Sequence, residues 1–328
     1  MSNPTSTVRL WIPPRPPTRS CCVRPTDRRG TVVVDPLAEA LADPTLSADA
    51  RQKLQNVQDV LHADSQARLI SLFFEGEEPR AAVAFGDFDA AELIVVVLHG
   101  IDTDLAAFRG WAGIAQRLCA DTIRASALRG GSVRIATVAW FGYDSGTHLS
   151  ALATKHATVG AARLAGDLVR MRHRHPGARI AVLAYSYSST LFGELVLMDG
   201  AGPVSMAFSI ASAGMTHMAA DAVAEAISKR EFSFYATEAA SDATAPLGRL
   251  GAHPVDPRDI EGAIVYGSDG GPIPGSGGQQ GEATDGHASQ TEVDERGGRH
   301  PGYFDPRAQA YLFALQRLAR LASRRPKA

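Results

Sequence analysis

Ser186 is the residue whose surroundings most clearly indicate chemistry. The hydrophobic run at 180–185 predicts a strand that ends directly before this serine, and a helix containing 191–198 follows it. A serine on a tight turn between a strand and a helix presents its hydroxyl for nucleophilic attack, an arrangement called a nucleophile elbow. The pattern therefore predicts a nucleophilic serine at position 186.

The residues two positions before and after an elbow serine must be small, because strand and helix approach closely there. These positions hold Ala184 and Ser188, so the usual G-x-S-x-G becomes A-x-S-x-S. If Ser188 were the nucleophile, Thr190 would occupy the crowded position and the strand would be awkwardly long. Ser186 is therefore the better candidate.

A serine hydroxyl needs a base to take its proton. Among ten histidines, His300 lies on a loop just before the final helix, where the order nucleophile, acid, base places the histidine. His253 is the main rival. His99 follows an early strand and is disfavoured by chain order, and His287 is assigned no role because it lies in a glycine-rich stretch.

A carboxylate on a loop after a late strand should orient the base. Asp242, five residues past the strand expected at 231–237, is the chosen acid. Glu238 is the next candidate and Asp256 a further one. A solvated loop charge remains the alternative interpretation for all three.

Two backbone amides should stabilise the negative oxygen that forms during acyl transfer. One is expected from Tyr187, which follows the nucleophile. The other is expected from the loop after the strand at 92–98, where Gly100 lets the backbone bend toward a ligand and Ile101 or Asp102 presents its amide.

Alternating strands and helices predict the fold that positions these residues. A helix at about 47–66, with Ser47 as its N-cap, precedes a hairpin of strands at 68–75 and 80–85. Further strands are expected at 92–98, 133–140, 180–185, 204–211 and 231–237, with helices at 105–118, 149–173, 191–198 and 216–229, and a last helix capped by Asp305. This order predicts an α/β fold with a mostly parallel central sheet and helices on both faces.

The ends of this fold differ in composition from its middle. Residues 1–30 contain six prolines and six arginines and are expected to form a disordered tail, followed by one domain at 31–328. Within it, 268–298 carries nine glycines and is expected to be a flexible loop, either a lid or a plain tether.

Composition excludes several classes of protein. The chain has 328 residues with 33 basic and 35 acidic side chains, which argues against a nucleic-acid binder. No apolar run is long enough to span a membrane. The three cysteines, Cys21, Cys22 and Cys119, form no disulfide framework, and a cytoplasmic location is expected because no signal peptide is recognisable.

Four segments carry a resemblance to a known family. The sequence resembles the uncharacterised actinobacterial α/β-hydrolase family grouped as a domain of unknown function, at 96–100, 138–144, the elbow around Ser186, and 300–306. The resemblance implies an α/β-hydrolase fold and serine-hydrolase architecture. Asp144 and Tyr303 match motif positions of that family. The resemblance is consistent with a role in the site for these residues and equally with packing and loop anchoring.

The leading hypothesis is a serine hydrolase of esterase or acyl-transfer type. It would use Ser186, His300 and Asp242 on a small acyl ester, without a metal or organic cofactor. Because the usual elbow of the family reads Gly-His-Ser-Tyr-Gly, the first alternative is a hydrolase-like binding scaffold without turnover. The second alternative is a cell-envelope lipid esterase related to cutinases. Oligomeric state and acyl length are left open.

Overall fold

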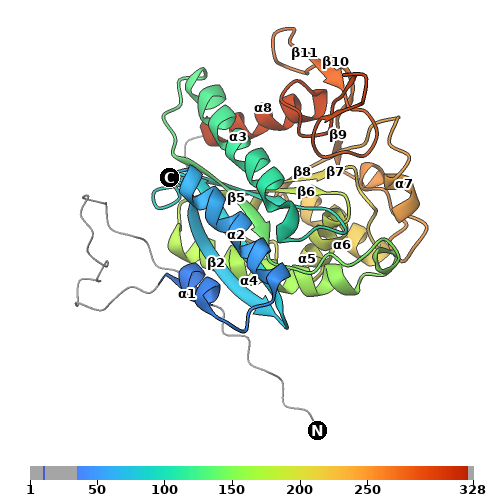
Figure 1. Cartoon of the computed structure of the whole chain (residues 1–328). Helices are drawn as coiled ribbons and strands as arrows, with labels where there is room; N and C mark the ends of the chain where they lie inside the picture. Colours follow the sequence, from blue (N-terminus) through green and yellow to red (C-terminus); the bar gives the residue numbers. More distant parts are fainter. Residues whose placement is uncertain (1–9, 12–34, 324–328) are drawn as a thin grey trace.

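The computed structural model describes residues 10–11 and 35–323, and these form a central sheet covered by helices (Figure 1). Within the described residues the sheet has the strand order β1-β2-β3-β5-β4-β6-β7-β8-β9. Its strands are β1 (Leu10–Trp11), β2 (Arg68–Glu75), β3 (Glu78–Gly86), β4 (Leu93–Leu98), β5 (Ile135–Phe141), β6 (Arg179–Tyr185), β7 (Val204–Ile210), β8 (Ser233–Thr237) and β9 (Ile264–Val265).

The sheet is parallel from β5 to β9, while β3 pairs antiparallel with both β2 and β5. The expected hairpin and the expected mostly parallel α/β sheet are thus confirmed. Because the parallel strands run the same way, their carboxyl ends meet at one edge. The loops after β4, β6 and β8 therefore lie where a site can be assembled.

The central strands are buried on both faces because their side chains alternate between two cores. In β4, Val95 and Val97 belong to one core, and Ile94 and Val96 to the other. The first core includes α2 (Ala48–Ala63), α3 (Phe108–Ala127) and α8 (Gln309–Ser323); the second includes α4 (Lys155–Arg174), α5 (Ser188–Leu197) and α6 (His217–Ser228). Continuous β-branched sequence is typical of such doubly covered strands.

Most expected elements are present, with shifted ends. Ser47 caps α2 as expected, since its hydroxyl accepts from the amide of Ala50 at 3.2 Å. The helix expected from 149 begins only at Lys155, after a short 3-10 turn, η2 (Ser150–Leu152). The structure adds two helices that were not expected, α1 (Pro36–Ala42) and α7 (Ala245–Gly248), and a second 3-10 turn, η1 (Leu105–Ala107), before α3.

Asp305 does not cap the last helix. Its carboxylate accepts from the amide of Arg307 at 2.8 Å, and its carbonyl accepts from the amide of Ala308 at 2.9 Å. Asp305 thereby closes a separate turn. The helix α8 begins only afterwards, at Gln309.

The glycine-rich segment at 268–298, expected to be a flexible loop, contains short strands. It holds β10 (Asp269–Pro272) and β11 (Gln280–Ala283), which form a hairpin, and β12 (Glu292–Val293), which pairs with β13 (Arg299–His300). A Cβ on Gly281 would come within 2.4 Å of the Cα of Gln309, so this glycine allows the hairpin to lie against α8.

Two further expectations concern the chain ends and membranes. The proposed tail at 1–30 lies outside the described residues except for β1, which pairs with β2. Cys21 and Cys22 are also outside, and Cys119 is a buried free thiol. Among the helices in the described part of the chain, none has the length and apolar character needed to cross a bilayer.

Candidate active site

Ser186 lies on the turn between β6 and α5 with a left-handed backbone. Its φ is 57°, a conformation that residues other than glycine rarely adopt. The neighbouring strand β7 holds this turn, because the amide of Ser186 donates to the carbonyl of Ile210 at 2.8 Å. Strained backbone of this kind persists where the surrounding structure dictates it, and it occurs often at functional sites.

The two flanking positions are filled without conflict by residues larger than glycine. Ala184 and Ser188 are both buried. The hydroxyl of Ser188 donates to the carbonyl of Tyr185 at 2.9 Å and lies 3.3 Å from that of Leu98. A buried hydroxyl is tolerated when it is hydrogen-bonded, so the A-x-S-x-S elbow forms a well-packed turn.

A histidine connects Ser186 to a carboxylate, and it is His287. The Ser186 Oγ lies 2.9 Å from His287 Nε2, and His287 Nδ1 lies 2.8 Å from Asp242 Oδ2 and 3.0 Å from Oδ1. These distances are within hydrogen-bond reach, the geometry that proton transfer requires. The structure therefore brings two of the three expected residues together around a histidine that was given no role.

His300, the expected base, lies elsewhere. It belongs to β13, and its ring nitrogens face Asp285 at 2.6 Å and Asp294 at 3.4 Å. The pairing of β12 with β13 fixes His300 in this acidic setting, while the segment between β11 and β12 carries His287 to the elbow. The expectation for the histidine is thus corrected from His300 to His287.

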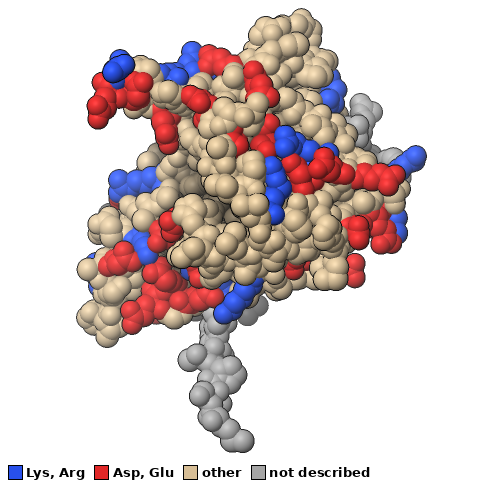
Figure 2. Space-filling view, turned by 90° about the vertical axis from the view of Figure 1, so that its right-hand side faces the viewer, with Lys and Arg blue, Asp and Glu red and all other residues tan. Residues whose placement is uncertain are grey.

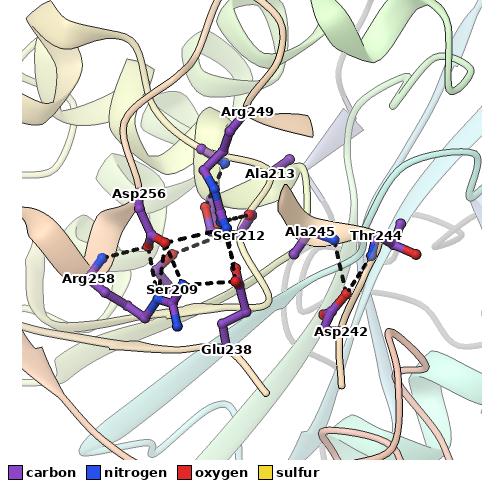
Figure 3. A network of polar contacts seen from close by, with 12 residues as sticks. Ser209, Ser212, Ala213, Glu238, Asp242, Thr244, Ala245, Arg249, Asp256 and Arg258 are labelled. Atoms are coloured by element: carbon purple, nitrogen blue, oxygen red, sulfur yellow. Dashed lines mark hydrogen bonds and ion pairs between the residues drawn. The ribbon is translucent and has the colours of Figure 1, made fainter. Parts of the chain in front are cut away.

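Asp242 is fully buried at its side chain and receives four hydrogen-bond donors. The amides of Thr244 and Ala245 each donate to Oδ1 at 3.0 Å (Figure 3). The hydroxyl of Tyr303 donates to Oδ2 at 2.9 Å, beside His287. Burial opposes the charge, but the hydrogen bonds from His287, Ala245 and Tyr303 hold the pKa of Asp242 below its ordinary value.

Tyr303 is therefore part of the carboxylate's environment. Its ring is buried, and its hydroxyl also accepts from the amide of Ala239 at 2.8 Å. Burial raises the pKa of the Tyr303 phenol, so the phenol stays protonated and remains a donor. The accepted amide proton and the donated hydroxyl proton together fix the direction of the hydroxyl toward Asp242.

The segment that carries His287 is held by hydrogen bonds rather than by regular structure. The amide of Gly286 donates to Ser241 Oγ at 3.0 Å, one residue before Asp242 in the chain. The amide of Tyr303 donates to the carbonyl of Ala288 at 3.0 Å. The hydroxyl of Tyr185 donates to the carbonyl of His287 itself.

The loop after β4 approaches Ser186 closely. A Cβ on Gly100 would lie 3.1 Å from the Cβ of Ser186, so glycine leaves space at this contact. The amide of Asp102 is already used, donating to the carbonyl of Gly146 at 3.2 Å. Between described residues, the amides of Ile101 and Tyr187 donate to no backbone or side-chain acceptor.

Glu238, the second acid candidate, lies in a separate ion network (Figure 3). Its carboxylate contacts Arg249 at 2.6 Å and Arg258 at 2.9 Å, and Asp256 faces Arg258 at 2.6 Å. Arg249 also donates to the carbonyl of Ser212 at 3.0 Å. This network attaches the segment after α7, including the 3-10 turn η3 (Pro257–Asp259), to the ends of the sheet strands.

The other candidates, His253 and Asp144, make contacts elsewhere. Both ring nitrogens of buried His253 lie 2.6 Å from carbonyl oxygens, those of Ala213 and Ala151. Asp144 accepts from the amide of Gly146 at 3.0 Å and lies 3.3 Å from His156. Neither residue contacts Ser186.

His99, disfavoured as a base, is buried beside the elbow loop. Burial lowers its pKa to about 4, although the adjacent carbonyl of Gly100 favours the charged form. His99 therefore stays neutral near pH 7. Its ring stacks on Tyr143 at 4.8 Å between centroids, which gives it a packing role.

Figure 2 shows the side of the molecule on which α7 lies in Figure 1. Acidic and basic side chains are interspersed around a broad area of other residues, so this view shows no field of a single sign. Within the described residues, no three His, Cys, Asp or Glu side chains are grouped so that they could hold a metal ion.

Comparison with known proteins identifies the family. The family model for alpha/beta hydrolases matches residues 76–252, more than half of the chain. The chain therefore belongs to the alpha/beta hydrolase family. The matched range includes Ser186 and Asp242 and ends before His287. No curated protein sequence matches the chain.

Several solved structures are similar at low identity. The poly(3-hydroxybutyrate) depolymerase LpqC of Bordetella parapertussis is 13% identical with a TM-score of 0.38, covering 61% of this chain and 83% of that one. A putative hydrolase of Agrobacterium vitis is 12% identical with a TM-score of 0.37, covering 78% and 96%. An esterase of Pyrococcus furiosus is 10% identical with a TM-score of 0.37, covering 65% and 84%.

Proposed function

We propose that this protein is a serine hydrolase that acts on small acyl esters through Ser186, His287 and Asp242. The observation that carries the proposal is the hydrogen-bonded series in which the Ser186 Oγ lies 2.9 Å from His287 Nε2 and His287 Nδ1 lies 2.8 Å from Asp242. Nucleophile, base and orienting acid in this order define a reaction class independently of fold.

The reaction begins when the Ser186 Oγ attacks the acyl carbon while its proton moves to His287 Nε2. Asp242 accepts a hydrogen bond from Nδ1, which fixes the ring and stabilises its positive charge. The amides of Tyr187 and Ile101 donate to the negative oxygen. Each such donor lowers the barrier by about 3 kcal/mol.

The tetrahedral intermediate collapses when the carbon–oxygen bond to the leaving group breaks and that oxygen takes the proton from His287. Water then attacks the acyl-enzyme while His287 accepts a proton from it. The second intermediate releases the carboxylic acid and returns the proton to the Ser186 Oγ. The cycle consumes one ester and one water, releases the alcohol and the carboxylic acid, and uses no cofactor.

A fluorophosphonate reagent tests the proposal, because it reacts with activated serines. We expect one label per chain on the wild type and none on Ser186→Ala. Ser189→Ala is a matched control, since this buried serine of α5 accepts a hydrogen bond from the Ser209 hydroxyl at 2.9 Å and donates to the carbonyl of Ala184 at 3.3 Å. Labelling that persists in Ser186→Ala would exclude the assignment.

Turnover separates an enzyme from a binding scaffold. We expect a burst of p-nitrophenol from p-nitrophenyl acetate followed by steady release. A label on Ser186 with neither burst nor steady release would favour the scaffold alternative.

A further inference from the structure

Tyr185 directly precedes Ser186, and its side chain touches the other two parts of the candidate site. Its hydroxyl donates to the backbone carbonyl of His287, and the two rings lie 5.4 Å apart between centroids. Its ring also lies against the loop after β4, because a Cβ on Gly100 would be 3.2 Å from two of its ring carbons. The Tyr185 side chain thus contacts both the His287 segment and the loop after β4, and its backbone directly precedes Ser186.

The surroundings of Tyr185 keep this side chain in one position. Only 6% of the residue is exposed. Its ring packs against Trp111 at 5.5 Å and Phe304 at 5.8 Å between centroids. Burial raises the pKa of the phenol, which therefore stays protonated and able to donate.

We propose that Tyr185 is a positioning residue that holds residues 284–289, the base-bearing segment, against the elbow, so that His287 stays within proton-transfer reach of Ser186. This inference rests on the proposed function. The segment at 284–289 belongs to no helix or strand of the described chain, so its position depends on hydrogen bonds such as this one. Because Tyr185 is adjacent to Ser186 in the chain, its hydrogen bond to His287 fixes the position of the proposed base relative to the proposed nucleophile.

The expected effect is on rate rather than on binding. A displacement of about 1 Å between reacting groups can cost up to 10²-fold in rate. Tyr185 donates to the backbone of His287, so its loss changes where the imidazole lies without removing a contact to substrate. The kcat should fall while KM stays nearly constant.

Tyr185→Phe removes the hydroxyl and keeps the ring that packs on Gly100. We expect about a tenfold loss in kcat for p-nitrophenyl acetate and in the rate of fluorophosphonate labelling, with KM within twofold. The matched control is Tyr311→Phe, which also removes a buried hydroxyl hydrogen bond, here to Asp121 at 2.6 Å. It should retain wild-type rates.

Hydrogen–deuterium exchange gives a readout that does not depend on activity. We expect faster exchange of the peptide at 284–289 in Tyr185→Phe, by about tenfold, and no change in Tyr311→Phe. Wild-type rates and exchange in Tyr185→Phe would overturn the inference, as would equal losses in both variants. A different outcome would be faster exchange in Tyr185→Phe together with labelling that survives Ser186→Ala. It would show that the proposed function has failed although Tyr185 does hold the segment at 284–289 in place.

Discussion

The elbow and the base-bearing segment are held in place by different forces. Ser186 lies between β6 and α5, where buried apolar residues of both cores and neighbouring strands surround the turn. His287 lies on a stretch without regular structure that is held by Ser241, Tyr185 and the backbone of Tyr303. Ser186 is placed by the hydrophobic core, and His287 by a few polar contacts.

This difference predicts how each region responds to substitution. Changes that disturb the elbow should lower the free energy of unfolding, because they disturb packing shared by the whole sheet. Changes in the base-bearing segment should lower the rate and leave global stability nearly unchanged, because such a segment can move locally.

The largest loss of activity with the fold retained is expected from Asp242→Asn. An amide favours the wrong histidine tautomer and removes the charge that stabilises imidazolium, so kcat should fall on the order of 10⁴-fold. Steady-state kinetics with circular dichroism would measure this. Asp144→Asn, on a half-exposed loop carboxylate, is the control and should keep wild-type kcat. A loss below tenfold in Asp242→Asn would contradict the assignment of the acid.

A paired comparison of Ser188→Val and Gly286→Ala tests the contrast directly. Valine at the fully buried position 188 overfills the elbow and loses the hydrogen-bonded hydroxyl, so it should cost about 2–3 kcal/mol in the free energy of unfolding. Gly286 has a φ of 64° with open space around a Cβ, so alanine should cost only about 1 kcal/mol of backbone strain. Urea unfolding measures the free energy of unfolding of the two variants, and steady-state kinetics measures their kcat. Equal destabilisation by the two variants would refute the contrast.

Tyr303→Phe should give a smaller effect, since it removes one of four donors to Asp242. We expect a loss of about 1–2 kcal/mol in stability at pH 7 and a several-fold loss in kcat. The folded pKa of Asp242 is depressed below 3.8, so the stability it contributes is present above that value and is lost as pH falls through the folded pKa. The stability difference between wild type and variant should therefore shrink below about pH 4 in urea titrations. A difference that grows on acidification would contradict this role.

The smallest effect is expected from His300, which is half-buried. Hydrogen bonds to Asp285 and Asp294 raise its pKa above the ordinary 6.5. The contribution of these two hydrogen bonds to the stability of the folded segment is therefore fully present below about pH 6.5, and it is lost as pH rises through the folded pKa of His300. Limited proteolysis near 285–300 should be faster at pH 8.5 than at pH 5.5, and His300→Gln should abolish that difference. A difference that survives in the variant would exclude His300 as its source.

The sheet, its flanking helices and the elbow were predictable because they follow from local patterns. Apolar runs at 92–98 and 180–185 require burial, and a strand that meets a helix at Ser186 leaves few backbone choices. Asp242 was proposed from chain order and lies 2.8 Å from His287, the base that we propose. Its partner Tyr303 was singled out by motif, without a signal for its contact.

The histidine was not predictable by the same reasoning. His287 and His300 both follow the acid on a loop, so chain order does not separate them. The choice depends on the pairings β10–β11 and β12–β13, which join residues with little hydrophobic signal. The glycines of 268–298 were interpreted as flexibility, whereas Gly281 permits a close backbone contact with Gln309.

The most direct test compares His287→Ala with His300→Ala in ester hydrolysis and fluorophosphonate labelling at pH 7.5. The account predicts that His287→Ala loses kcat on the order of 10⁴-fold and labels Ser186 at a negligible rate, while His300→Ala stays within threefold of the wild type. Retained activity in His287→Ala together with an inactive, folded His300→Ala would contradict it.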